Sequence, residues 1–340
     1  MRVAILAHEK FPDRAKTALG VLRYADYEAV AVLDRENPGR RVNEFVPDVQ
    51  DAPIVSGMDD IEPEAVDALL IGIAPIGGGF DESWREDVRT ALESGCDVIS
   101  GLHYFLAEDE EFADLAAEHG CELRDVRKPP ADLTVAEGVA GDVDAEVITT
   151  VGTDCSVGKM TVTMELAREA REAGYDVGVI PTGQTGIMIE GWGNPIDRVV
   201  SDFTAGAVEE MITEVGDDHD YLLVEGQGSI VHPAYSAVTC GILHGSMPDG
   251  LLLCHDAGRE AIHGYESFPL PSIPTYVDLY EELSAPVSGA DVVAGALNTA
   301  DLEDDAAARE AVDAYAAELD APATDVIRFD AADLFEAIVE

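Results

Sequence analysis

The chain has 340 residues, 47% of them hydrophobic, with 20 basic and 69 acidic side chains, so its formal net charge at pH 7 is -49. This length is sufficient for two domains with a core each, and the hydrophobic fraction is too high for a disordered chain. Nucleic acids and anionic membranes require a basic face, so the charge argues against both as partners.

The excess of acid also indicates a cellular setting. An acidic shell on a hydrophobic chain is typical of a salt-loaded cytoplasm, where ions screen like charges within about 3 Å at 1 M ionic strength. We therefore expect a halophilic, cytoplasmic protein that loosens in dilute buffer. The chain begins MRVAILAH, which predicts a first β-strand and no signal peptide, and no apolar run approaches the ~20 residues of a membrane span.

The cysteines predict neither a disulfide framework nor a metal site. Their number is odd, and they lack the paired C-x-x-C spacing of a zinc or redox site. They are Cys96, Cys121, Cys155, Cys240 and Cys254. We expect reduced thiols and no bound metal.

Residues 1–130 predict a Rossmann-like domain, because apolar strand patterns alternate with helical patterns. The strands are expected at 2–7, 28–33, 66–74 and 97–100, and the helices at 13–24, 82–93 and 106–120. This rhythm predicts a doubly wound parallel sheet. The first turn lacks the G-x-G-x-x-G pattern of a dinucleotide site. The stretch PIGGG at 75–79 fits a ligand-binding edge and a tight turn equally well.

Residues 124–130, with a double proline at the end, indicate the passage to a second domain. We expect that domain to cover residues 131–340 and to be an α/β domain resembling P-loop NTPases. Its strands are expected at 146–151, 176–181, 221–225, 251–254, 291–297 and 325–329, with helices that include 203–215, 303–319 and 331–339.

The segment GTDCSVGKMT follows the first strand of this second domain and opens a helix. A glycine loop between a strand and a helix directs backbone N–H groups and the positive helix end at one point, and a lysine adds a full charge there. We therefore predict a phosphate-binding loop. Its residues are Gly152, Thr153, Asp154, Cys155, Ser156, Val157, Gly158, Lys159, Met160 and Thr161.

This loop differs from the usual G-x-x-x-x-G-K-[ST] in two respects. It is one residue longer between the glycines, and Met160 stands where a Ser or Thr hydroxyl normally holds Mg²⁺. A thioether binds Mg²⁺ poorly. Unless Thr161 takes over that task, the loop binds phosphates without being equipped to cleave them.

Further polar residues follow the expected strands. Glu225 ends a buried strand, where a charge is costly unless it is paired or used, so we favour a functional role. Single histidines such as His232 are more often hydrogen-bonded structural residues than catalysts. The position of Cys155 beside Lys159 at a helix start predicts a lowered thiol pKa and permits an acyl-cysteine, although a packing role is favoured.

Several motifs together resemble a known family. GTDCSVGKMT, PTGQTGI, DRVVSDFTAGAVE, EGQGS and HPAYS resemble the DgcN family, long known only as a domain of unknown function, and the loop alone resembles that of dethiobiotin synthetases. The resemblance covers most of the second domain, and the family also has a Rossmann-like first domain. It implies an N-acetyltransferase of D-amino acid catabolism, with acetyl-CoA as donor and D-glutamate or a related D-amino acid as the small-molecule substrate.

The resemblance suggests roles for the remaining candidates. The phosphates of coenzyme A suit a loop that binds phosphates without Mg²⁺. Glu225 or His232 is the candidate base, and backbone N–H groups of the loop that follows Glu225 are candidate donors to the oxyanion. Arginines are candidates to pair with the substrate's carboxylates. The expected substrate-side residues are Gln184, Arg198, Gly226, Gln227, Ser229 and Arg259. We also expect a homo-oligomer.

Two alternatives stay open. One is an ATP-dependent ligase or kinase of the dethiobiotin synthetase type, in which Thr161 or Glu225 recruits Mg²⁺. The other is a nucleotide-binding protein without catalytic turnover.

Overall fold

The computed structural model describes residues 1–75 and 77–339, so Ile76 of the predicted turn at 75–79 and Glu340 of the predicted second domain lie outside the described residues. The chain divides into two compact units. The first contains residues 1–129 and 184–195, and the second contains residues 130–183 and 196–339. Residues 184–195, which we had expected in the second domain, therefore pack with the first unit.

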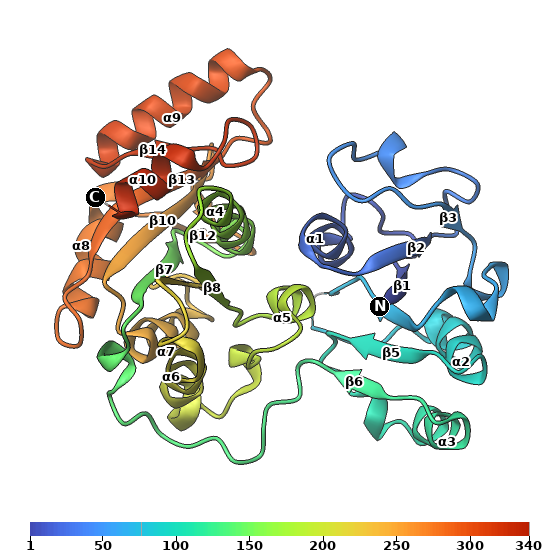
Figure 1. Cartoon of the computed structure of the whole chain (residues 1–340). Helices are drawn as coiled ribbons and strands as arrows, with labels where there is room; N and C mark the ends of the chain where they lie inside the picture. The colour runs from blue at the N-terminus through green and yellow to red at the C-terminus, as the bar shows by residue number, and fades with distance from the viewer. Residues whose placement is uncertain (76, 340) are drawn as a thin grey trace. The chain divides into compact units, whose positions relative to one another are not determined.

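The first unit is a doubly wound α/β fold. Its strands are β1 (Arg2–Leu6), β2 (Glu28–Leu33), β3 (Ile54–Val55), β4 (Ala68–Ile71), β5 (Asp97–Ser100) and β6 (Leu123–Asp125). Its helices are α1 (Lys16–Tyr24), α2 (Arg85–Glu93), α3 (Glu110–His119) and α5 (Gln184–Glu190). The sheet is parallel in the order β3-β2-β1-β4-β5-β6, with α1 packed against α5 and α2 against α3 (Figure 1). This confirms the Rossmann-like prediction.

The second unit has its own parallel sheet. The strands are β7 (Glu146–Gly152), β8 (Val177–Ile180), β9 (Tyr221–Val224), β10 (Gly250–Asp256), β13 (Asp291–Asn298) and β14 (Ala323–Thr324), in the order β14-β13-β10-β7-β9-β8. A separate antiparallel hairpin is formed by β11 (Ala261–Ile262) and β12 (Tyr265–Pro269). The helices are α4 (Lys159–Glu172), α6 (Thr204–Val215), α7 (Ser236–Ser246), α8 (Ile273–Ser284), α9 (Asp305–Leu319) and α10 (Ala332–Val339).

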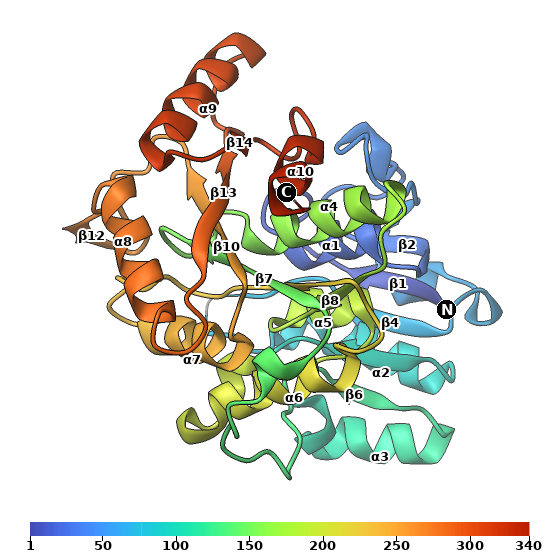
Figure 2. The same ribbon diagram turned by 60° about the vertical axis from the view of Figure 1, so that its left-hand side comes forward.

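Alternating side chains of β7 bind helices on opposite faces of this sheet. Thr149 donates to the Ser246 hydroxyl of α7 at 3.0 Å, whereas the next residue, Thr150, lies 3.2 Å from the Thr163 hydroxyl of α4. In Figure 2, α10 lies beside α4, and α6 lies near α7. The predicted phosphate loop, which connects β7 to α4, therefore begins at the end of a central strand, and helices cover both faces of the sheet to which this strand belongs.

Several predicted elements were wrong or missing. The expected strand at 325–329 is a turn, because the Asp325 carboxylate accepts the backbone N–H groups of Ile327 and Arg328 and so replaces a strand ladder. The strand of this region is β14, two residues earlier. The helix α5, which begins at Gln184 soon after β8, was not predicted. The elements β3, β6, α7, α8 and the β11–β12 hairpin were not predicted.

Among the described residues, none of the helices combines the length and the apolar character that a membrane crossing requires.

The segment that enters the second unit is fastened by one buried carboxylate. Glu209 of α6 is only 6% exposed, and its two oxygens accept the backbone N–H groups of Glu137, Gly138 and Val139 at 2.6–2.8 Å. Charged hydrogen bonds of this kind are roughly twice as strong as neutral ones. Glu209 therefore holds the irregular entry segment against the helix.

We expect Glu209→Ala to lower the free energy of unfolding by about 3 kcal/mol, because three N–H groups lose a charged acceptor. Urea unfolding in concentrated KCl, followed by circular dichroism, measures this change, and hydrogen exchange at residues 137–139 should accelerate. The matched control is Glu210→Ala, since Glu210 is the exposed neighbour on the same helix. Equal stability of the two variants would contradict the assigned role.

Candidate functional site

The phosphate loop has the geometry of an anion nest. Ser156 and Gly158 have left-handed backbones with φ of 57° and 102°, and α4 begins directly afterwards at Lys159. Within the described part of the chain, the backbone N–H groups of Ser156, Val157 and Gly158 donate to no other protein group. Successive N–H groups in such a turn, together with a helix N-terminus, form a binding site for phosphate oxygens.

Lys159 lies over this nest rather than in solvent. Its side chain is 7% exposed, and its Nζ donates to the carbonyl oxygens of Asp154 and Gly228, both at 2.8 Å. Gly152 is required for this position, because a Cβ atom there would lie 2.8 Å from Nζ. The ammonium group is therefore buried next to the nest and held by backbone oxygens, which leaves its full positive charge available to an anion.

Three hydroxyl groups fix the start of the loop. Tyr280 donates to the Gly152 carbonyl and Tyr276 to the Thr153 carbonyl, both at 2.7 Å, and Ser229 also donates to the Thr153 carbonyl at 3.0 Å. Burial raises the pKa of Tyr280 to about 12, so this hydroxyl remains a donor. The two tyrosines come from α8, which was not predicted, so their role could not be inferred from the sequence beyond their four-residue spacing.

Asp154 connects the loop to the β11–β12 hairpin. Its carboxylate is fully buried, and Oδ2 accepts the Arg259 guanidinium at 3.1 Å and the His263 backbone N–H at 2.7 Å. The other oxygen accepts the Cys155 N–H at 2.7 Å. Arg259 also donates to Asp256 at 2.5 Å. We call the nest of residues 156–158 together with Lys159 the cradle. Asp154 and Arg259 thus lie beside the cradle and brace it, and the Arg259 side chain is 18% exposed.

The loop after β9 lies directly against the cradle. The Gly226 N–H donates to Thr150 Oγ1 at 2.9 Å, and a Cβ at Gly226 would lie 1.7 Å from the Thr150 carbonyl oxygen, so only glycine fits. Gln227 Nε2 donates to the Thr182 carbonyl at 2.6 Å. The Gly226 N–H is therefore already bound, and the side chains of Gln227 and Ser229 hold neighbouring loops together.

Glu225 directly follows β9 and is hydrogen-bonded by backbone groups. It is 6% exposed, and Oε2 accepts the N–H groups of Thr182 and Gly183 at 3.2 and 3.1 Å. The buried carboxylate is thus oriented by the chain that follows β8. This places an acid at the same edge of the sheet as the phosphate loop, as parallel topology requires.

His232 has a defined tautomer. Its Nδ1 accepts the backbone N–H groups of Ala234 and Tyr235 at 3.1 and 3.2 Å, so a neutral ring carries its proton on Nε2. Burial lowers its pKa, Lys159 acts in the same direction, and Asp154 acts against them. His232 is therefore held neutral, with an N–H donor directed to within 3.9 Å of Asp154 Oδ1. This geometry favours a hydrogen-bond donor over a proton acceptor.

One group of side chains has metal-like spacing. Within the described residues, only Asp154, Cys155 and His232 bring potential ligand atoms within 4.8 Å of one another. A metal would need the lone pair of His232 Nε2, but the two N–H groups donated to Nδ1 place the ring proton on Nε2. Both Asp154 oxygens also accept hydrogen bonds. The donor set does not fit a metal centre.

A histidine to which no role was assigned from the sequence also contacts the loop. His255, which lies at the end of β10, places Nδ1 2.8 Å from Thr153 Oγ1. Burial lowers its pKa, as does the nearby Arg259, while Asp256 opposes the shift. Its place at the end of a strand beside β7 is the signal that could have identified it.

Two further predicted substrate residues lie on other elements. Gln184 belongs to the first unit, where its Oε1 accepts Arg127 Nη2 at 2.5 Å. Arg198 is exposed on a short 3₁₀ turn, Ile196–Arg198, of the second unit.

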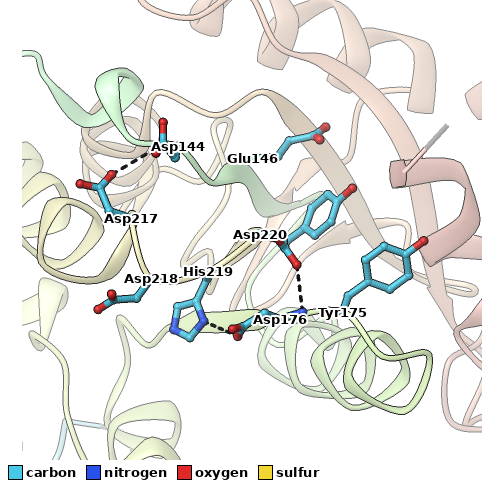
Figure 3. A pocket seen from close by; sticks show the side chains of 9 residues that line it. Asp144, Glu146, Tyr175, Asp176, Asp217, Asp218, His219 and Asp220 are labelled. Atoms are coloured by element: carbon cyan, nitrogen blue, oxygen red, sulfur yellow. Dashed lines mark hydrogen bonds and ion pairs between the residues drawn. The ribbon is translucent and has the colours of Figure 1, made fainter.

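A pocket at the opposite edge of the second sheet has the wrong charge for an anionic ligand. It lies at the amino ends of β7, β8 and β9, and Figure 3 shows its acidic side chains together with His219, which lies 2.7 Å from Asp176. Its acids are Asp144, Glu146, Asp176, Asp217, Asp218 and Asp220. Burial, reinforced by Asp249, raises the pKa of Glu146. Phosphates and carboxylates would be repelled here, so the candidate site is the cradle.

The chain matches two parts of one known family. Residues 134–335 match the profile described as "Domain of unknown function (DUF1611_C) P-loop domain", and residues 35–129 match "Domain of unknown function (DUF1611_N) Rossmann-like domain". A crystal structure of a DUF1611 family protein from Anabaena variabilis is 39% identical, with a TM-score of 0.94 and 99% of each chain covered.

Two relatives carry a functional name. A protein named D-glutamate N-acetyltransferase from Tritonibacter scottomollicae is 35% identical over 265 residues, which is 78% of this chain and 76% of that protein. A protein of the same name from a Pseudoalteromonas species is 38% identical over 211 residues, 62% of this chain and 63% of that protein.

The lowered pKa of His232 predicts a pH dependence. The folded state favours the neutral His232 ring. The contribution of this ring to the free energy of unfolding is therefore present above the unfolded pKa of about 6.5, and it is lost as the pH falls through the lower folded pKa. We expect the stability difference between the wild type and His232→Gln to shrink between about pH 8 and pH 5. Urea unfolding of both proteins across this range measures it. A difference that stays constant would refute the tautomer assignment.

Proposed function

The chain belongs to the DUF1611 family, and on that basis we propose that it is an N-acetyltransferase that moves the acetyl group of acetyl-CoA to the amino group of D-glutamate or a related D-amino acid. The named relatives, at 35% and 38% identity, support the reaction class. The observation that carries the choice of donor is the cradle, with Lys159 buried over a nest of N–H groups.

The cradle suits a ligand whose phosphates are bound but not cleaved. Met160 is 4% exposed, so the residue after the lysine turns an apolar thioether into the core instead of offering a hydroxyl to Mg²⁺. Thr163, one turn further along the helix, donates to the Lys159 carbonyl. Coenzyme A carries its phosphates far from the thioester, so binding them requires no chemistry at phosphorus. Acetyl-CoA fits this arrangement better than a nucleotide that is to be cleaved.

The proposed reaction is an acyl transfer. The substrate ammonium loses one proton, and its nitrogen attacks the thioester carbonyl carbon to form the oxyanion. When the oxyanion collapses, the carbon–sulfur bond breaks, and the second proton lost by the nitrogen passes to the departing sulfur, which leaves as the thiol. Glu225 is the proposed acceptor of the ammonium proton, because it is a carboxylate oriented at the edge of the sheet. His232 is the other candidate base suggested by the sequence, but its Nδ1 accepts two backbone N–H groups and its ring lies against the phosphate loop, so Glu225 is favoured.

Arginine is the proposed partner of the substrate's carboxylates, because its planar guanidinium binds them in a bidentate manner. Arg198 and Arg259 are the candidates, and Arg259 is held beside the phosphate loop by Asp154 and Asp256. In the alternative, an ATP-dependent ligase or kinase, the same cradle would hold the nucleotide phosphates.

One assay distinguishes these functions. The protein is incubated in multimolar KCl with acetyl-CoA and a panel of D- and L-amino acids, and the free thiol and the product mass are measured with and without Mg²⁺. We expect an acetylated D-amino acid without added metal. Formation of ADP from ATP that depends on both Mg²⁺ and the amino acid would instead establish the ligase or kinase.

We expect Lys159→Ala to weaken acetyl-CoA binding about 100-fold, because a buried charge to phosphate is lost. Titration calorimetry in concentrated KCl measures the change. Lys128→Ala is the matched control, because Lys128 is one of the few other lysines and its side chain is 55% exposed in the first unit. Unchanged affinity in Lys159→Ala would show that the phosphates bind elsewhere.

A further inference from the structure

Exposed aromatic side chains gather beside the cradle. Of the four aromatic residues among the large exposed hydrophobic residues described, three are Tyr235, Tyr265 and Phe268, which are 53%, 40% and 48% exposed. We call these three side chains the aromatic wall. Tyr235 follows β9, and the other two lie on β12, a strand whose five residues are all exposed. Exposed aromatic side chains that gather on one surface, instead of being scattered singly, indicate a binding site.

The aromatic wall is joined to the cradle through His232. The His232 ring centroid lies 4.6 Å from that of Tyr235 and 5.2 Å from that of Tyr265. Tyr265 and Phe268 lie 6.5 Å apart in an edge-on arrangement. Because Nε2 of the same histidine is 3.9 Å from Asp154 Oδ1, only one imidazole ring separates the wall from the phosphate loop.

The hairpin that carries Tyr265 and Phe268 is fixed in place. Asp154 accepts the His263 N–H in the turn between β11 and β12, and it also binds Arg259, which precedes β11. The Arg259 guanidinium donates in addition to the Cys155 carbonyl at 3.2 Å. The wall is therefore attached to the phosphate loop itself at two points of the hairpin, which presets its distance from the nest.

The position beside the cradle identifies the occupant. The phosphates and the base of a nucleotide are covalently joined, so a site for the phosphates has the base within reach. Aromatic faces stack on any base without sequence-specific hydrogen bonds.

We propose that the aromatic wall binds the adenine ring of the nucleotide whose phosphates lie in the cradle. The identification of that nucleotide as the adenosine diphosphate part of coenzyme A rests on the proposed function. Tyr265 and Phe268 supply stacking faces, Tyr235 flanks them, and the neutral His232 ring forms the floor between the wall and the phosphates.

The test compares ligands with and without an adenine ring. Binding of acetyl-CoA, S-acetyl-4′-phosphopantetheine and ADP is measured by calorimetry in concentrated KCl. In the double variant Tyr265→Ala/Phe268→Ala we expect the Kd of acetyl-CoA to rise about tenfold or more, while that of S-acetyl-4′-phosphopantetheine stays unchanged. Tyr265→Phe keeps the aromatic face and should bind acetyl-CoA as the wild type does.

Two further variants make the comparison specific. Tyr175→Ala is the matched control, since Tyr175 is equally exposed at 39% but lines the acidic pocket at the opposite edge of the sheet. Tyr265→Leu keeps the apolar bulk without a π face, and it replaces the double variant if that protein melts early. We expect weakened acetyl-CoA binding in Tyr265→Leu and wild-type binding in Tyr175→Ala.

The outcomes separate this inference from the proposed function. If the wild type binds ADP but not acetyl-CoA, and the wall variants weaken ADP binding, the inference stands and the proposed donor is wrong. If the wall variants bind acetyl-CoA and ADP like the wild type, the inference is overturned. It is also overturned if they lose S-acetyl-4′-phosphopantetheine to the same extent, or if the wild type binds no adenine compound.

Discussion

The arrangement of the loops in the second unit depends on the burial of one ammonium group, that of Lys159. Lys159 is desolvated at the start of α4, and the carbonyls of Asp154 and Gly228 compensate for the lost water. Those two carbonyls come from the loops after β7 and β9, so both loops must be held closely. The glycines at 152 and 226 allow that approach, and the buried hydroxyls of Tyr276, Tyr280 and Ser229 fix it.

The second unit is electrically asymmetric about its sheet. The carboxyl ends of the strands carry the nest, Lys159 and Arg259, whereas the amino ends of β7, β8 and β9 carry the acidic pocket (Figure 3). On a chain with so few cations, this arrangement places the N–H groups of the nest and the Lys159 ammonium together at one edge. An anionic ligand therefore finds hydrogen-bond donors and a buried ammonium at the cradle, and it finds carboxylates at the acidic pocket.

The sequence predicted what depends on local pattern. The fold class of both units, β7 and the start of α4 at Lys159 followed from apolar strands and one glycine loop. Contacts between distant segments were not predictable. The Asp154–Arg259 pair, for example, joins residues 105 positions apart. The tautomer of His232 was missed for a different reason, because the two N–H groups that determine it come from a local turn that has no recognisable sequence pattern. The helix α7 was missed because its glycines and β-branched residues disfavour helix, so packing must stabilise it.

The division of the chain imposes an order on synthesis. The first unit contains α5, which the ribosome makes only after β7, α4 and β8 of the other unit. The hydroxyls of Thr17 and Thr185 lie 3.0 Å apart, and this contact can form only after the intervening residues 130–183 of the second unit have been synthesised. Domains generally mature from the N-terminus during translation. Here the first unit cannot be completed until more than half of the polypeptide has been synthesised. Until then, the surface of α1 that α5 covers in the folded protein remains exposed.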